Sequence, residues 1–298
     1  MLQSQPSLPL STTTNPILVC SGKGTKRTFT LKISASRYFG AVKISAPYWD
    51  YLVARMIGKL QRSIGIGSGA FDCANEVDAI SHLLEKNGHG DPGRMFILDI
   101  GGNRGDWTYE ASKRWPGSDF VIFEPSAAAL NQLQSRFFSA QNIEIVSEAL
   151  SDSIGDAKLY SDVPGSGLGS LTQRDLKYIG IDFLHSETVK ISTLDNYLVG
   201  NPKSIAILKI DVEGHELAVL RGAINLFTSD RKPTIVQFEF GGACIDTRTY
   251  FKDLWKFFEN CGYDFYRIGK GKLHQISEYQ EELETFKTTN IIAVTKAH

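Results

Sequence analysis

The hydrophobic positions of this chain fall into short continuous runs, several of which end at an acidic residue. Continuous apolar runs of this length are typical of strands buried on both faces of a parallel sheet. Between them, apolar positions recur every three to four residues, which indicates amphipathic helices. The runs predict strands at 96–100, 119–125, 143–150, 205–211 and 234–239. Because strands and helices alternate, the sequence predicts an α/β domain with a doubly wound, mostly parallel sheet.

The end of the chain has a different pattern. Two short runs, 264–268 and 290–295, have no long helix between them and therefore predict a hairpin. A hairpin adds antiparallel pairing at one edge of the sheet. Rossmann domains that bind nicotinamide cofactors usually lack such an edge.

Residues 1–93 are predicted to form an N-terminal extension. Its first 30 or so residues are polar and contain proline, so we expect them to be poorly ordered. Helical spacing of apolar residues at 48–60 and 74–85 predicts two helices, which we interpret as a cap. The domain proper is expected to span residues 94–298.

A glycine-rich turn follows the first strand of the domain, with the sequence D-I-G-G-N-R-G at residues 99–105. Gly101 and Gly102 have no Cβ, so a ligand can approach the backbone and a positive φ is allowed. The spacing differs from the G-x-G-x-x-G of dinucleotide sites, because an acid stands before the glycines. It suits a cofactor with a cationic centre and an amino-acid tail, such as S-adenosylmethionine. We therefore expect Asp99, Gly101, Gly102, Asn103 and Gly105 to bind the cofactor.

The second and third strands supply further candidate cofactor contacts. Glu124 ends the second strand, near the spacing at which an acid meets ribose hydroxyls in nucleotide-binding βαβ units. A carboxylate can accept both hydrogen bonds of a ribose diol. Glu148 and Ala149, at the end of the third strand, are expected beside an adenine edge.

Composition limits the class of partner. The net charge is −1 and the pI is near 6.6, so nothing favours nucleic acid as a partner. No apolar run is long enough to predict a membrane span, and residues 1–14 do not resemble a secretory signal. The four cysteines have neither zinc nor disulfide spacing, and free thiols lead us to expect a cytoplasmic protein.

Several motifs together resemble one known family. They are D-I-G-G-N-R-G at 99–105, F-E-P at 123–125, G-S-L at 169–171, S-T-L-D at 192–195, L-K-I-D-V-E-G-H-E at 208–216 and Q-F-E-F at 237–240. In this order they resemble the FkbM-type S-adenosylmethionine-dependent methyltransferases over about residues 94–296. Gly102 departs from the family, which usually has alanine there. The resemblance implies a class I methyltransferase fold with a seven-stranded sheet, and methyl transfer to a hydroxyl of a sugar, glycan or secondary metabolite.

The acids that end the strands provide candidates for catalysis. Asp99, Asp211 and Glu239 are expected to converge at one rim of the sheet, where carboxylates would stabilise a sulfonium cation. An alcohol needs a base to become a good nucleophile, and His215 is the first candidate because imidazole titrates near neutrality. Asp211 is the second candidate. His215 could instead be a simple helix cap beside Glu216.

Two further questions remain open, the presence of a metal and the class of function. We expect no metal, although Asp211, Glu213, His215 and Glu239 could hold a divalent cation that acidifies the hydroxyl. The alternatives to a methyltransferase are a Rossmann-type NAD-dependent oxidoreductase and a non-catalytic nucleotide-binding protein of the same fold. A nucleic-acid methyltransferase is disfavoured by the charge and by the lack of an Asn/Asp-Pro-Pro-aromatic motif after the fourth strand.

Overall fold

The computed structural model describes residues 17–21, 28–32, 42–44, 46–67, 72–87 and 93–296, with backbone only before residue 49. The chain divides into two compact units, Met1–Leu60 and Gln61–His298. The expectation that the first 30 or so residues are poorly ordered concerns positions that lie mostly outside the described residues, as does the side chain of Cys20. The other three cysteines are free thiols.

The first unit contains a small antiparallel sheet and a helix. The strands β1 (Ile17–Ser21), β2 (Thr28–Lys32) and β3 (Val42–Ile44) pair in sequence order. Helix α1 (Ala46–Ser63) begins in this unit and agrees with the helical spacing at 48–60. Among the described helices, none is both long and apolar enough to cross a bilayer.

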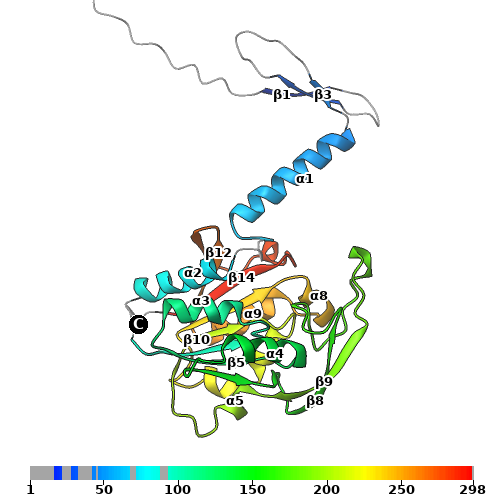
Figure 1. Ribbon diagram of the computed structural model, residues 1–298. Coiled ribbons are helices and arrows are strands. Elements are labelled where there is room, and N and C mark those ends of the chain that lie inside the picture. The colour runs from blue at the N-terminus through cyan, green and yellow to red at the C-terminus, as the bar shows by residue number, and fades with distance from the viewer. Residues whose placement is uncertain are drawn as a thin grey trace, which may run out of the picture. The chain divides into compact units, whose positions relative to one another are not determined.

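The second unit is built on an eight-stranded sheet (Figure 1). Its strands are β4 (Phe96–Ile100), β5 (Asp119–Phe123), β6 (Ile143–Val146), β10 (Ile205–Ile210), β11 (Ile235–Phe240), β12 (Tyr263–Gly269), β13 (Lys272–Ile276) and β14 (Thr289–Thr295). Their order is β13-β12-β14-β11-β10-β4-β5-β6. The strands from β11 to β6 pair in parallel, whereas β14 is antiparallel to both of its neighbours. The predicted class, a mostly parallel sheet with an antiparallel edge, is confirmed.

The edge differs from the prediction in one respect. The hairpin joins β12 to β13, a strand that the sequence analysis missed, and β14 inserts between β12 and β11. The tight turn between β12 and β13 places Gly271 at a φ of 62°, a conformation that glycine adopts at little cost. The sheet therefore has eight strands instead of the expected seven.

Helices cover both faces of this sheet, as a doubly wound fold requires. One face packs against α2 (Cys73–Lys86), α3 (Asp106–Arg114) and α4 (Ala127–Arg136). The other packs against α5 (Leu194–Tyr197), α6 (Glu216–Arg221), α7 (Ile224–Phe227), α8 (Ala243–Thr247) and α9 (Phe251–Asn260). Neighbouring residues of one strand serve opposite faces: Ile97 belongs to the first core and Leu98 to the second. Two 3₁₀ helices, Lys177–Ile179 and Glu281–Leu283, lie in connections.

Helix α2 belongs to this second unit. Its buried residues Val77, Ile80 and Leu83 share one core with Met95 and Ile97, at the start of the sheet. The boundary between the two compact units lies after Leu60, and α2 packs against the large sheet. The domain boundary at residue 93 stays a prediction.

A second, three-stranded sheet, with strand order β7-β9-β8, follows β6 along the chain. The predicted strand 143–150 divides into β6 and a short β7 (Ala149–Leu150), and β7 pairs with β9 (His185–Ser192). Residues Gly155–Ser161 form β8, antiparallel to β9. The alternation within β8 is short and weak in sequence, and its partner β9 comes more than 20 residues later along the chain.

Candidate functional site

The main cleft of the domain lies at the carboxyl ends of the parallel strands. Ligands bind at this edge in open α/β sheets, because the loops that follow the strands diverge there. The space within the cleft, counted with the solvent at its open mouth, is about 660 Å³. Of the predicted site residues, Gly101, Asn103, Glu124, Glu148, Ala149, Asp211 and His215 line it.

The glycine turn after β4 forms one wall. Gly101 has a φ of 81°, and a Cβ there would lie 1.9 Å from the carbonyl oxygen of Asp211, so only glycine fits. The amides of Gly101 and Gly102 donate to the carbonyl of Phe123, at 2.9 and 3.1 Å. These two amides are therefore occupied within the protein and are not free to donate to a ligand.

Glu124, directly after β5, is held in place by two backbone donors. Its Oε2 accepts from the N–H of Asn103 and its Oε1 from the N–H of Ser126, each at 2.8 Å. Each oxygen keeps a second lone pair, so the carboxylate can still accept both hydrogen bonds of a diol. Burial raises the pKa of Glu124 to about 7, against the opposing effect of the two N–H donors.

The neighbouring wall is mostly apolar. Glu148 and Ala149 line the cleft at the passage from β6 into β7, and their place beside an adenine stays a prediction. Leu150 and Leu159, from β7 and β8, also line the cleft, as does Leu171 in the connection between β8 and β9. A flat aromatic base fits between such side chains.

A glycine-rich segment after β8 completes the cleft and was missing from the predicted site. Gly165, Ser166, Gly167 and Gly169 all line it. The side chain of Asn103 donates to the carbonyl of Ser166 at 3.2 Å, which ties this segment to the turn after β4. The signal that could have identified this segment is the cluster of glycines at 165, 167 and 169.

Three predicted cofactor residues have structural roles instead. Asp99 is 1% exposed, and its carboxylate accepts from the hydroxyl of Thr108 at 2.6 Å. A Cβ on Gly102 would lie 2.2 Å from the side chain of Ile122, and one on Gly105 would lie 2.5 Å from Phe137. The two glycines thus allow close packing of the turn and of α3, and none of the three lines the cleft.

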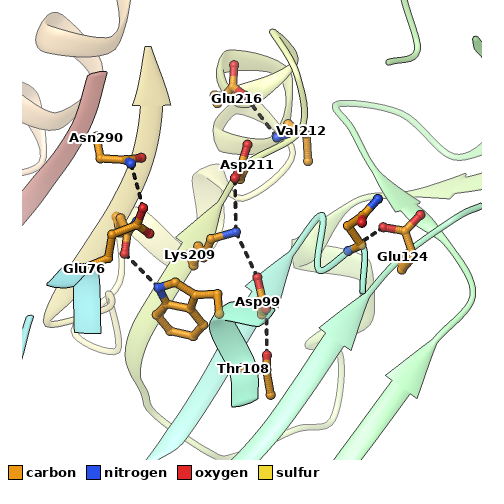
Figure 2. A network of polar contacts seen from close by, with 12 residues as sticks. Glu76, Asp99, Thr108, Glu124, Lys209, Asp211, Val212, Glu216 and Asn290 are labelled. Carbon is orange, nitrogen blue, oxygen red and sulfur yellow. Dashed lines mark hydrogen bonds and ion pairs between the residues drawn. The ribbon is translucent and has the colours of Figure 1, made fainter. Parts of the chain in front are cut away.

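Lys209 was not among the predicted site residues. Its ammonium group lies 3.3 Å from Oδ1 of Asp99 and 3.3 Å from Oδ2 of Asp211 (Figure 2), and the residue is buried. Burial alone lowers the pKa of Lys209, but the two carboxylates outweigh it and raise the pKa above its ordinary value. The apolar run that contains this lysine is the signal that could have identified it, because a charge inside a buried strand requires a partner.

Three carboxylates gather at the ends of β10 and β11. Asp211, Glu213 and Glu239 each offer an oxygen within 4.8 Å of the others. Arg174 pairs with Glu213 at 2.7 Å and with Asp246 at 3.2 Å. Burial, followed by repulsion from Asp211, raises the pKa of Glu213 to about 8 and that of Glu239 well above its usual range. Glu239, a predicted catalytic residue, belongs to this cluster but does not line the main cleft.

His215 lies at the start of α6 and lines the cleft together with Asp211. Its Nε2 is hydrogen-bonded to the hydroxyl of Thr172 at 2.8 Å. Burial lowers the pKa of His215, so the imidazole is neutral at pH 7. A neutral imidazole can accept a proton, which is the property that a general base needs.

The chemistry of the cleft fits S-adenosylmethionine. Glu124 can accept from a ribose diol, and the apolar wall can hold an adenine. Asp211 places negative charge where a sulfonium or an amino group would lie, and His215 is close to the same end. The residues of this chain therefore match the ribose, the adenine and the cationic groups of that cofactor.

Comparison with known proteins agrees with this assignment. The model of the methyltransferase FkbM domain matches residues 99–265, more than half of the 298 residues. "Methyltransferase 1" of Beauveria bassiana (strain ARSEF 2860) is 30% identical over 148 residues, which are 44% of this chain and 59% of that protein. The chain thus spans less than two thirds of that relative's length.

Similar solved structures include two methyltransferase-fold proteins at low identity. Precorrin-6y C5,15-methyltransferase from Geobacter metallireducens has a TM-score of 0.38 at 14% identity, with 68% of this chain and 81% of that chain covered. Aeropyrum pernix fibrillarin, solved with S-adenosyl-L-methionine, has a TM-score of 0.37 at 13% identity, with coverages of 68% and 66%. These scores are low, so the fold rests on the strand order described above. Since the family model spans the glycine turn, Glu124 and the acidic strand ends, the chain belongs to the FkbM methyltransferase family, whose cofactor is S-adenosylmethionine.

Proposed function

We propose that this protein transfers the methyl group of S-adenosylmethionine to a hydroxyl of a sugar, a glycan or a secondary metabolite. The observation that supports it most is the arrangement of one cleft. At one end Glu124 has two free acceptor positions, and at the other a neutral His215 lies beside Asp211. A cofactor site and a base for an alcohol therefore share one cavity.

The base is the imidazole of His215. When its Nε2–H donates to Thr172, Nδ1 has the lone pair that can accept the hydroxyl proton. When bound, S-adenosylmethionine supplies an electrophilic methyl group on a sulfonium. The walls of the cleft align the acceptor oxygen with that methyl group, and such alignment provides much of the acceleration in group transfer.

Calorimetric titration with S-adenosylhomocysteine tests the cofactor site. We expect micromolar affinity for the wild type and no binding of NAD. Glu124→Ala should weaken the affinity about tenfold to hundredfold, because hydrogen bonds to a charged group are lost. Glu259→Ala, at an exposed position of α9, is the control and should bind like the wild type. Binding of NAD, or equal affinity in Glu124→Ala, would contradict the proposal.

Transfer itself is measured with a labelled methyl donor and a panel of hydroxylated acceptors. With an acceptor identified, His215→Gln should lose most of the transfer rate while it keeps the affinity for S-adenosylhomocysteine. A base of this kind contributes about 10²–10⁴-fold to a rate. If His215→Gln transfers at the wild-type rate, the base is another group, and Asp211 becomes the candidate.

A further inference from the structure

The carboxylate cluster at the ends of β10 and β11 has the spacing of a cation site. Oxygens of Asp211, Glu213 and Glu239 lie within 4.8 Å of one another. Two oxygens that bind the same divalent cation at about 2.0–2.6 Å can be at most about 4–5 Å apart. The three residues could therefore reach one ion with small side-chain movements.

Two of the three acids leave one oxygen unused. Lys209 donates to Oδ2 of Asp211 and Arg174 to Oε2 of Glu213, and no other contact of either carboxylate is found among the described residues. Oδ1 of Asp211 and Oε1 of Glu213 are therefore open to a ligand.

Glu239 provides an independent observation. Within the part of the chain that the structure describes, its carboxylate has neither a hydrogen bond nor an ion pair, and the residue is only partly exposed to solvent. A buried carboxylate without a partner is costly, since it has lost its hydration and gained nothing in return. Its oxygen faces Asp211 and Glu213, and the residue retains partial exposure, through which an ion could enter.

The charges around the cluster do not balance. Five acids lie in or beside the cluster, and two cations, Lys209 and Arg174, form ion pairs with four of them. The five acids are Asp99, Asp211, Glu213, Glu239 and Asp246. Lys209 is shared between Asp99 and Asp211, and Arg174 between Glu213 and Asp246. Both cations are therefore already shared between two acids each, and Glu239 has none of its own among the described residues.

We propose that Asp211, Glu213 and Glu239 bind a hard divalent cation such as Mg²⁺ or Mn²⁺. Carboxylate oxygens are the ligands that these ions prefer. Asp211 and Glu213 also line the main cleft, so an ion held there would lie next to His215. Its role rests on the proposed function: the ion binds the acceptor oxygen and makes its O–H more acidic, and the proton goes to Nδ1 of His215. The oxygen then bonds to the methyl carbon, while the carbon–sulfur bond breaks and sulfur keeps the electron pair.

The test is a titration of the chelator-treated full-length chain with Mn²⁺ alone, followed by electron paramagnetic resonance of the free ion. We expect one saturable site per chain. Glu239→Gln should weaken it at least tenfold, because the variant removes a charged ligand and preserves the shape of the side chain. The matched control is Asp246→Asn, which changes an acid bound to the same Arg174 but outside the cluster, and its Mn²⁺ affinity should change less than threefold.

Calorimetry with S-adenosylhomocysteine, on the same samples, separates this proposal from the proposed function. If the compound binds but Mn²⁺ does not saturate, or binds equally to Glu239→Gln, the cation site is refuted and Glu239 is instead a protonated acid. If Mn²⁺ binds as expected but the compound does not, the site stands and the proposed function fails. Retained binding of the compound by Glu239→Gln shows that a loss of Mn²⁺ affinity is not unfolding.

Discussion

At the carboxyl edge of the large sheet, the acids beside β4 and β5 have different hydrogen-bond and ion-pair partners from the acids beside β10 and β11. On the β4–β5 half, Asp99 accepts from Thr108 and Lys209, and Glu124 accepts from two backbone amides. On the β10–β11 half, Glu239 has no partner among the described residues, and Asp211 and Glu213 share their cations with other acids. Figure 2 shows the first arrangement, with Lys209 between Asp99 and Asp211.

The two halves are therefore suited to different kinds of ligand. Donors that are already in place fix the β4–β5 half for a ligand with hydroxyl groups, at no cost of reorganisation when the ligand binds. The β10–β11 half instead accumulates negative charge, which only a proton or an added cation can relieve. Lys209 connects the halves, since its ammonium group contacts an acid from each.

The largest effect should come from removing that connection. Lys209→Met leaves Asp99 buried without its cation, and breaking a buried pair in this way costs about 3–5 kcal/mol of stability. Urea unfolding measures the loss. Adding Asp99→Asn to Lys209→Met should restore part of it, because the unpaired charge is removed. If the double variant is less stable than Lys209→Met alone, the ion pair does not explain the effect.

A glycine of the turn tests how rigid the β4–β5 half is. Gly101→Ala places a methyl group 1.9 Å from the carbonyl of Asp211 at a positive φ, so we expect a loss of about 2–5 kcal/mol. Gly167→Ala is the matched control, since Gly167 lines the same cleft and has nothing within 4 Å of a Cβ. Thermal unfolding should distinguish the two variants, and equal melting temperatures would show that the turn adapts.

The pH dependence of cofactor binding tests the charge on Glu124. Its pKa is raised by burial to about 7, so the group loses its proton as the pH rises through 7. The carboxylate accepts two ribose hydrogen bonds, whereas the protonated acid has given up part of its acceptor capacity. Affinity for S-adenosylhomocysteine should therefore increase up to about tenfold between pH 6 and 8. Calorimetry of Glu124→Gln should show no such increase; a parallel increase would assign the titration to another group.

The smallest expected effect concerns the start of α4. Glu187, on β9, accepts from the hydroxyl of Ser126 at 2.9 Å and from the N–H of Ala127 at 3.2 Å, so it acts as a helix cap supplied by another strand. Glu187→Gln should reduce stability by about 0.5–2 kcal/mol, as for other caps. The same change should weaken cofactor binding only slightly, because Ser126 also donates to Glu124. A loss of binding comparable to that of Glu124→Ala would mean that β9 positions the ligand directly.

The sequence alone determined the frame of this protein. Continuous apolar runs that end at acids predicted the parallel strands, since a strand buried on both faces cannot alternate. The position of Glu124 after such a run was enough to predict its place in the cleft, and so was that of Asp211. The positions of β13 and β8 were not predicted in this way, because their own patterns are weak, and the partner of β8 comes more than 20 residues later along the chain.

Only the tertiary structure decided which acids face a ligand and which serve the fold. Asp99 and Glu124 look alike in sequence, each near the end of a buried strand. In the folded chain, Asp99 is enclosed by Thr108 and Lys209, whereas Glu124 keeps free lone pairs toward the cleft. The same holds for Glu239: its position in the sequence does not show that its carboxylate has neither a hydrogen bond nor an ion pair among the described residues. The local sequence pattern determines at which end of a strand a side chain lies. Its protonation state and its access to a ligand depend on neighbours that only folding brings together.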